Sequence, residues 1–162
     1  MKNAIYPGTF DPITNGHLDI INRARLLFDN ITVAVTNNPH KAPLFSIEDR
    51  IEMIANAITE LKCDNVTIDS FEGLLVDYVR RQGAIAIVRG LRATSDFEFE
   101  FQMALANRKL AADVVTVFLM PHERYTYLNS TIVKELSRYG AKIEGFVSSF
   151  VARKLKEKMK QK

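Results

Sequence analysis

A twelve-residue segment near the start of the chain reads Tyr6-Pro7-Gly8-Thr9-Phe10-Asp11-Pro12-Ile13-Thr14-Asn15-Gly16-His17. It begins at the last residue of a short apolar run, Ala4–Tyr6, and it leads into a helical pattern that begins at His17. Gly8 leaves room for a close approach of the backbone to a ligand, and Thr9 adds a hydroxyl donor. At the predicted helix start, free N–H groups, the helix dipole and the His17 ring favour an anion. The segment therefore predicts a strand–loop–helix unit that binds phosphate.

The rest of the chain alternates short runs rich in Val and Ile with longer segments of helical period. The predicted strands are Ala4–Tyr6, Ile31–Thr36, Val66–Ile68, Ala84–Val88 and Val114–Met120. The predicted helices are His17–Phe28, one that starts after an N-cap at Ser46 with a stripe of Ile47, Ile51, Ile54, Ile58 and Leu61, then Leu74–Arg81, Thr131–Tyr139 and Phe146–Met159. This alternation predicts an α/β fold of Rossmann-like type, a doubly wound parallel five-stranded sheet with helices on both faces.

One further segment fits two patterns. Residues 97–101 alternate Phe and Glu, which taken alone indicates a strand. However, Phe97, Phe101 and Leu105 also fit one face of a helix, and residues 102–112 are rich in helix formers. We expect a helix in which Phe99 lies off the main apolar face, either as a subunit contact or as a half-exposed side chain.

Composition limits the class of protein. The 162 residues fit a single domain, and 47% hydrophobic with 25% charged residues exclude disordered and fibrous classes. Cys63 is the single cysteine, so no internal disulfide forms, and no Cys/His spacing resembles a metal site. No apolar run is long enough for a signal peptide or a membrane helix. We therefore expect a cytoplasmic protein with no membrane partner and no protein-bound metal.

The sequence pI of about 9.0 comes mainly from a basic tail, residues 153–162, which holds six Lys and Arg residues and one acid, Glu157. Without this tail the chain has 16 basic and 18 acidic residues. A charged terminal helix is the simpler interpretation of the tail, and an arm that binds polyanions is the alternative. We expect no nucleic-acid partner.

Further candidate residues follow the other predicted strands, where parallel sheets bind ligands. Arg89 and Arg92 flank Gly90 after the fourth strand, and their guanidinium groups suit either a phosphate or surface salt bridges. Lys41 follows the second strand. Hydroxyl side chains in residues 125–131 precede a predicted helix, where they suit either phosphate binding or capping.

Three parts of the sequence carry a resemblance to a known family. Thr14-Asn15-Gly16-His17 matches the nucleotidyltransferase superfamily signature, which is His or Thr, any residue, Gly, His. Residues 6–17 as a whole resemble the bacterial phosphopantetheine adenylyltransferase family. Arg89-Gly90-Leu91-Arg92-Ala93 and Asp96-Phe97-Glu98 fit the same family, and the resemblance runs from Ala4 to about Gly140.

The resemblance implies AMP transfer from Mg-ATP to 4′-phosphopantetheine, giving 3′-dephospho-coenzyme A and pyrophosphate in a homohexamer. It implies catalytic roles for His17, Lys41 and Arg92. It implies ATP contacts from Thr9, Phe10, His17, Gly90, Leu91, Arg92, Glu100, Tyr125, Thr126, Tyr127, Leu128, Asn129, Ser130 and Thr131. It implies contacts to the other substrate from Thr9, Lys41, Leu74, Leu75, Arg89 and Asn107. Asn129 departs from the family pattern, which has a serine there.

Chemistry favours direct in-line attack without a covalent intermediate. A phosphate monoester has its second pKa near ~6, so the acceptor is already mostly a dianion and needs no general base. Glu100 is therefore disfavoured as a base.

Two alternatives to this reaction remain. One is another nucleotidyltransferase of the superfamily, either a cytidylyltransferase or a nicotinate-nucleotide adenylyltransferase. The other is a non-catalytic module that binds nucleotides or polyanions through the tail. The sequence does not favour a dinucleotide-dependent oxidoreductase, because no Gly-x-Gly-x-x-Gly occurs. It does not favour a kinase either, because Gly140 and Gly145, which have the spacing of a Walker loop, are not followed by Lys-Ser/Thr.

Overall fold

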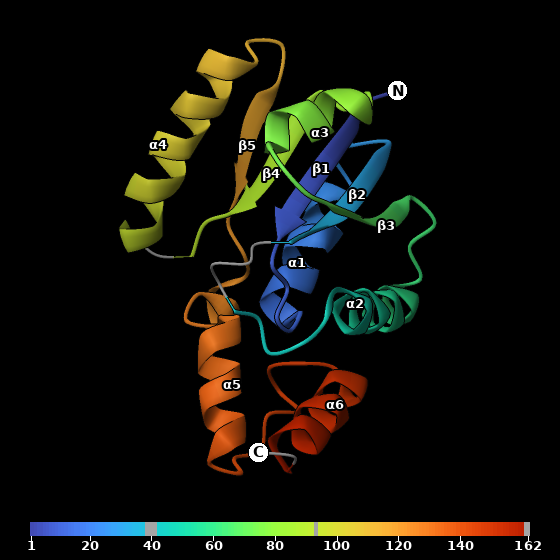
Figure 1. Cartoon of the computed structure of the whole chain (residues 1–162), viewed down its shortest axis with the longest axis vertical. Helices are drawn as coiled ribbons and strands as arrows, with labels where there is room; N and C mark the ends of the chain where they lie inside the picture. The colour runs from blue at the N-terminus through green and yellow to red at the C-terminus, as the bar shows by residue number, and fades with distance from the viewer. Residues whose placement is uncertain (38–41, 93, 161–162) are drawn as a thin grey trace.

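A parallel sheet forms the centre of the computed structural model, which describes residues 1–37, 42–92 and 94–160, without the side chains of residues 94–96 (Figure 1). Its strands are β1 (Asn3–Gly8), β2 (Asn30–Thr36), β3 (Val66–Phe71), β4 (Ala86–Gly90) and β5 (Val115–Leu119). They are ordered β3-β2-β1-β4-β5, with Ile5 opposite Thr32 on one side and Ile87 on the other. The chain thus winds outward from β1 in both directions, which confirms the predicted doubly wound sheet.

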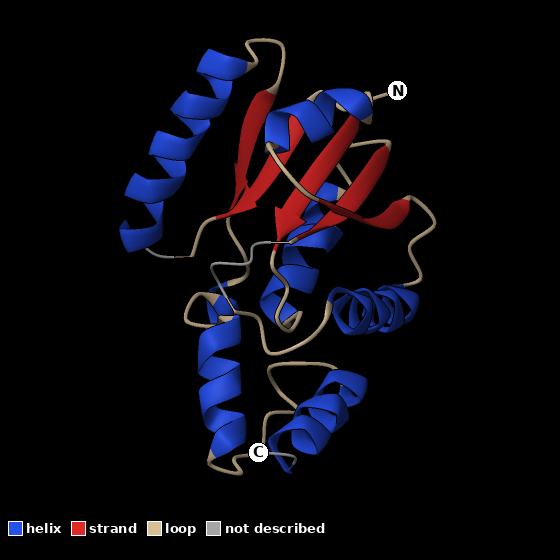
Figure 2. Ribbon diagram, in the orientation of Figure 1, coloured by secondary structure: helices blue, strands red, loops and turns tan. Residues whose placement is uncertain are grey.

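Helices lie on both faces of the sheet and beyond its carboxyl end (Figure 2). They are α1 (Asn15–Ala24), α2 (Ile47–Leu61), α3 (Leu75–Arg81), α4 (Thr94–Leu110), α5 (Ser130–Arg138) and α6 (Ser149–Lys160). Successive strand residues point to opposite faces, so Ala4 and Tyr6 join the core with α1 and α2, whereas Ile5 packs with α3. Two apolar clusters, one on each face, therefore hold β1 in the centre of the molecule.

Several element boundaries differ from the sequence predictions. α1 ends at Ala24 instead of Phe28, because Leu26 and Leu27 begin tighter turns and are exposed. β4 begins at Ala86, two residues late, because the Ala84 N–H donates to Val79 and closes the turn after α3. In contrast, Ser46 caps α2 as predicted, through the Asp49 N–H at 3.1 Å.

The segment with alternating Phe and Glu is helical, as expected, and forms the start of α4. The expected apolar face is not buried, however. Phe97 and Phe101 are both 46% exposed and Leu105 is 47% exposed, whereas Phe99 is 62% exposed. α4 thus presents apolar side chains on more than one side, and it lies along the edge of the sheet next to β5 (Figure 1).

All five strands point toward the same end of the molecule, where α5 and α6 lie (Figure 1). The first loop, which we define as residues 9–14 between β1 and α1, begins at this end. Parallel strands gather the loops that follow them at one edge, so residues distant in sequence meet there.

Candidate active site

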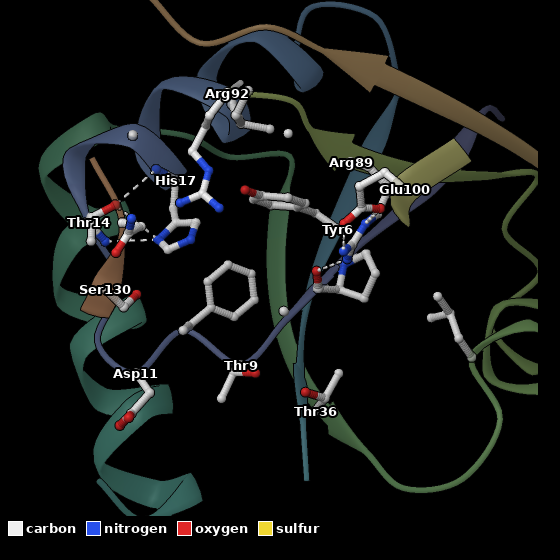
Figure 3. A pocket seen from close by; sticks show the side chains of 18 of the residues that line it. Tyr6, Thr9, Asp11, Thr14, His17, Thr36, Arg89, Arg92, Glu100 and Ser130 are labelled. Atoms are coloured by element: carbon white, nitrogen blue, oxygen red, sulfur yellow. Dashed lines mark hydrogen bonds and ion pairs between the residues drawn. The ribbon is translucent and has the colours of Figure 1, made fainter. Parts of the chain in front are cut away.

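A cavity of about 1040 Å³ lies at the carboxyl ends of the strands (Figure 3). The residues predicted from the sequence that line it are Thr9, Phe10, His17, Leu74, Leu75, Arg89, Gly90, Arg92, Glu100, Asn107, Leu128, Asn129, Ser130 and Thr131. They come from five different parts of the chain, and the fold brings them to one space. Their individual roles stay predictions.

Some predicted residues lie elsewhere. Leu91, Thr126 and Tyr127 are not among the described residues that line the cavity, and Tyr125 lies behind it, against Gly16. Lys41 falls outside the described residues, so its predicted role is untested by the geometry.

The imidazole of His17 is held from one side by the first loop. Its Nδ1 accepts a hydrogen bond from the Thr14 N–H at 3.0 Å, and the Thr14 hydroxyl lies 3.1 Å from the same nitrogen. A neutral imidazole carries one proton, and an Nδ1 that accepts places this proton on Nε2. In Figure 3 the rest of the ring faces the space bordered by Arg92 and Tyr6. His17 thus offers a fixed N–H donor to the cavity.

Burial, followed by the positive charges of Arg92 and Arg89, lowers the pKa of His17 to about 3. The unfolded chain holds this proton up to pH ~6.5, so it binds more protons than the folded chain between the two values. His17 therefore has no effect on the pH dependence of stability above pH ~6.5, and it lowers the stability of the fold progressively as the pH falls from ~6.5 toward 3. At neutral pH the ring is a hydrogen-bond donor without charge.

The start of α1 is more occupied than the sequence analysis expected. The Asn15 N–H donates to the Phe146 carbonyl at 2.8 Å, and the His17 N–H donates to the Thr14 hydroxyl at 3.4 Å. Two of the N–H groups expected to be free for an anion are thus already paired. An anion in the cavity would meet the His17 side chain instead.

Arg89 forms a two-point ion pair with Glu100. Its Nε donates to Oε2 at 2.7 Å, Nη2 donates to Oε1, and Nη1 donates to the Pro7 carbonyl at 3.1 Å. Within the part of the chain that the structure describes, three of the five guanidinium N–H groups are thus used, which leaves two that can bind another oxyanion. The pairing also places the Glu100 carboxylate against Arg89, which gives a physical reason why it is a poor candidate for a free base.

Arg92 connects β4 to the segment before α5, because its Nη1 donates to the Leu128 carbonyl at 3.2 Å. At the start of α5, the Asn129 side chain accepts from the Ile132 N–H at 2.8 Å and caps the helix. The departure at Asn129 therefore provides an N-cap. Ser130 and Thr131 begin the helix, and the first N–H groups of a helix have no partner within it.

Sequence reasoning assigned no role to Asp11 and Lys134, which both line the cavity. Asp11 is 4% exposed and accepts from the N–H groups of Leu44 and Phe45 at 2.9 and 3.0 Å. Lys134 Nζ lies 2.7 Å from its Oδ2, and Ser130 Oγ donates to Pro12 at 2.8 Å. These contacts fasten α5 and the segment that precedes α2 to the first loop. Lys134 follows Ser130 by four residues, so both side chains lie on the same face of α5. This spacing could have indicated from the sequence that Lys134 also faces the first loop.

Neither a metal cluster nor a membrane-spanning helix occurs among the described residues. Within the described residues, no group of three or more His, Cys, Asp or Glu side chains could hold a metal ion. No described helix is both long and apolar enough to cross a membrane.

Comparison with known proteins agrees with this geometry. A family profile described as cytidylyltransferase-like matches residues 5–136. The phosphopantetheine adenylyltransferase of Desulfosudis oleivorans is 53% identical over 159 residues, covering 98% of this chain and 94% of that one. That of Synechococcus elongatus is 56% identical over 150 residues, covering 93% and 89%.

A solved structure supports the fold. The bifunctional NMN adenylyltransferase/ADP ribose pyrophosphatase of Francisella tularensis matches with a TM-score of 0.71 at 16% identity, over 99% of this chain and 51% of that one. This chain therefore spans about half the length of that protein, and the likeness concerns the fold alone. The sheet, the cavity and the profile together define a cytidylyltransferase-like nucleotidyltransferase. Within this class, the chain belongs to the phosphopantetheine adenylyltransferase family.

We expect the His17 ring to remain neutral and protonated on Nε2 from pH 8 to pH 5, because burial and the two arginines oppose its protonation. Long-range ¹H–¹⁵N spectra of the free protein measure this state directly, and His17→Gln assigns the signals. The urea-unfolded chain is the control, since its histidines titrate near ~6.5. A folded-state His17 that titrates between pH 6 and 7 would contradict the expected environment.

Proposed function

We propose that this protein transfers AMP from Mg-ATP to 4′-phosphopantetheine and releases pyrophosphate and 3′-dephospho-coenzyme A, a step of coenzyme A biosynthesis. Relatives at 53% and 56% identity carry the name phosphopantetheine adenylyltransferase. The observation that carries the proposal is a single cavity in which a neutral histidine donor meets two arginines.

The reaction begins with attack of an acceptor phosphate oxygen on the α-phosphorus of ATP, in line with the departing pyrophosphate. The acceptor is mostly a dianion at neutral pH, because its second pKa is near ~6. No side chain needs to remove a proton, which agrees with the engagement of Glu100 by Arg89. The bond from the α-phosphorus to the acceptor oxygen forms as the bond to pyrophosphate breaks.

His17 acts as a donor to a non-bridging oxygen of the α-phosphate. Its Nε2–H is fixed because Nδ1 accepts from Thr14. Preorganised donors aimed at developing charge require no reorganisation during the reaction, and they act strongly in a site shielded from water. Because burial and the two arginines lower the pKa of His17 to about 3, the free protein holds almost no imidazolium at neutral pH. His17 is therefore proposed to act as a neutral hydrogen-bond donor and not as a general acid.

The two substrates are both anions, so cations must offset their repulsion. Among the described contacts of Arg89, its bonds to Glu100 and Pro7 use three N–H groups, and the other two are proposed to bind the acceptor phosphate. Arg92 and Lys41 act on the nucleotide phosphates. The first N–H groups of α5 have no partner within the helix, and with the helix dipole they favour the negative charge of the triphosphate.

Mg²⁺ is carried on the triphosphate, where it neutralises phosphate charge. The residues present fit this arrangement. Asp11 and Glu100, the carboxylates among the described lining residues, are engaged by Lys134 and Arg89 respectively. Neither side chain is left to hold a metal by itself.

The working assembly is a homohexamer in the cytoplasm. Support for self-association comes from α4, on which Phe97, Phe99, Phe101 and Leu105 are each at least 46% exposed. Burying such aromatic side chains against a second copy removes apolar surface from water. In the tail, Lys154 is paired with Glu52 at 2.7 Å and Leu155 is buried in the core, which favours the interpretation as a charged terminal helix.

A coupled pyrophosphate-release assay tests the proposed reaction. We expect pyrophosphate from Mg-ATP only when 4′-phosphopantetheine is present, with 3′-dephospho-coenzyme A identified by mass. CTP in place of ATP, and nicotinate mononucleotide in place of the acceptor, test the other nucleotidyltransferases. A folded sample that uses one of these pairs, and not the proposed pair, would overturn the substrate assignment.

His17→Ala is expected to lower kcat on the order of 10²–10³-fold, the usual cost of deleting one preorganised donor. His17→Gln should lose less, because an amide can donate to phosphate and also accept the Thr14 N–H within the helix cap. His122→Ala, outside the cavity, is the matched control and should retain activity. Near-normal turnover by a folded His17→Ala variant would remove His17 from the mechanism.

Light scattering coupled to size-exclusion chromatography should give the mass of six chains. Phe99→Asp is expected to reduce this mass, because it places a charge on the exposed apolar surface of α4. Leu26→Asp places the same charge at another exposed site, at the end of α1, and should leave the assembly intact. A wild-type monomer would contradict the proposed assembly without bearing on the chemistry.

A further inference from the structure

Arg50 is the one described arginine whose side chain is fully buried, at 1% exposure, although it does not line the cavity. It lies in α2 on the same face as Ile54 and Ala57, which are both buried in the core. Arginines are rarely buried to this extent unless their charge is paired. This burial therefore needs an explanation that the mechanism above does not give.

The guanidinium of Arg50 binds backbone carbonyls. Within the described residues, its Nη1 donates to Thr9 at 2.8 Å and to Thr36 at 3.1 Å, and its Nε donates to Ser46 at 3.2 Å. Thr36 is the last residue of β2, and Thr9 is the first residue of the first loop. One rigid group on α2 thus joins the ends of two central strands at the ligand-binding edge of the sheet.

The carbonyl of Thr9 belongs to a peptide unit next to a strained residue. Phe10 has φ of 48°, in the left-handed region that residues with a side chain rarely adopt. Such a conformation is unfavourable for a residue with a side chain, and it persists only when its surroundings enforce it. Arg50 holds the Thr9 carbonyl oxygen, which precedes Phe10 in the chain. Packing against Tyr6 and His17 holds the Phe10 ring.

The Phe10 ring transmits this restraint to the active site. It packs edge-to-face against Tyr6 at 5.4 Å and against the His17 imidazole at 5.2 Å between ring centroids. Phe10 is 3% exposed, so its ring has little room to move without displacing its neighbours. A shift of the Thr9 carbonyl would therefore reach His17 through one buried ring.

We propose that Arg50 is a positioning residue for His17, acting through the Thr9 carbonyl and the ring of Phe10. The kinetic part of this inference rests on the proposed function, in which His17 donates to the α-phosphate. The structural part does not, because the orientation of the His17 ring in the free protein can be measured without any substrate.

The test compares Arg50→Lys and Arg50→Gln with Ile54→Ala. Both Arg50 variants lose the planar fork that reaches two carbonyls from fixed positions, and the second also removes the buried charge. Ile54→Ala weakens the same helix in the same core by removing buried apolar atoms, and it does not replace any group that forms a hydrogen bond with Arg50. It therefore controls for loss of stability alone.

We expect either Arg50 variant to lower kcat on the order of 10–100-fold, as misplacement of a reacting group does. The KM for ATP should change less, because the lost contribution belongs to the transition state. Ile54→Ala should keep a kcat near that of the wild type at temperatures where it is folded. Equal losses in all three variants, or no loss in a folded Arg50 variant, would overturn the inference.

The second readout is the His17 side-chain signal in ¹H–¹⁵N and ¹H–¹³C spectra of the free variants. Both Arg50 substitutions should shift this signal, since the Phe10 ring lies against the imidazole, and Ile54→Ala should not. A His17 signal unchanged in folded Arg50 variants would contradict the proposed contact pathway. If the wild-type protein transferred no nucleotide, the proposed reaction would be lost, and these spectra would still decide whether Arg50 positions His17.

Discussion

The hydrogen bond from the Thr14 N–H to Nδ1 of His17 controls what the active site can do. It fixes the tautomer, so the one proton of the neutral ring lies on the nitrogen away from the first loop. It also contributes to the cap of α1, because the same residue pair forms a reciprocal capping box. The capping box that starts α1 thus also orients the Nε2–H donor of His17. Both effects depend on the spacing of three residues between Thr14 and His17.

Charge around this ring is arranged so that cations face the substrates and the histidine remains uncharged. Arg92 and Arg89 lower the pKa of His17 together with burial, while each is held by a carbonyl or a carboxylate of the protein. The arginines therefore need not become ordered when a nucleotide arrives. Reduced reorganisation of this kind is a main source of catalysis in transfers of charged groups.

Much of the fold could be predicted from the sequence, because local patterns specify it. The Val- and Ile-rich runs marked all five strands, and Ser46 marked the start of α2. The ligand edge also followed, since residues after parallel strands must meet there. The pairing of Arg89 with Glu100 and of Asp11 with Lys134 could not be predicted, because it depends on distances between segments up to 123 residues apart. The burial of Arg50 could not be predicted either, because an arginine within an amphipathic helix is normally a surface residue.

The left-handed backbone at Phe10 turns its ring back over the end of β1. This arrangement is possible because Gly8, the last residue of β1, has no side chain. A Cβ on Gly8 would lie 2.8 Å from Cζ of Phe10, closer than packed atoms tolerate. The space available at position 8 therefore depends on the side chain at position 10. A larger residue at position 8 becomes acceptable only after the ring at position 10 shrinks, and that change alters the wall against which the histidine rests. The two positions are expected to vary as a linked pair, and a path of single substitutions away from this pair passes through impaired intermediates.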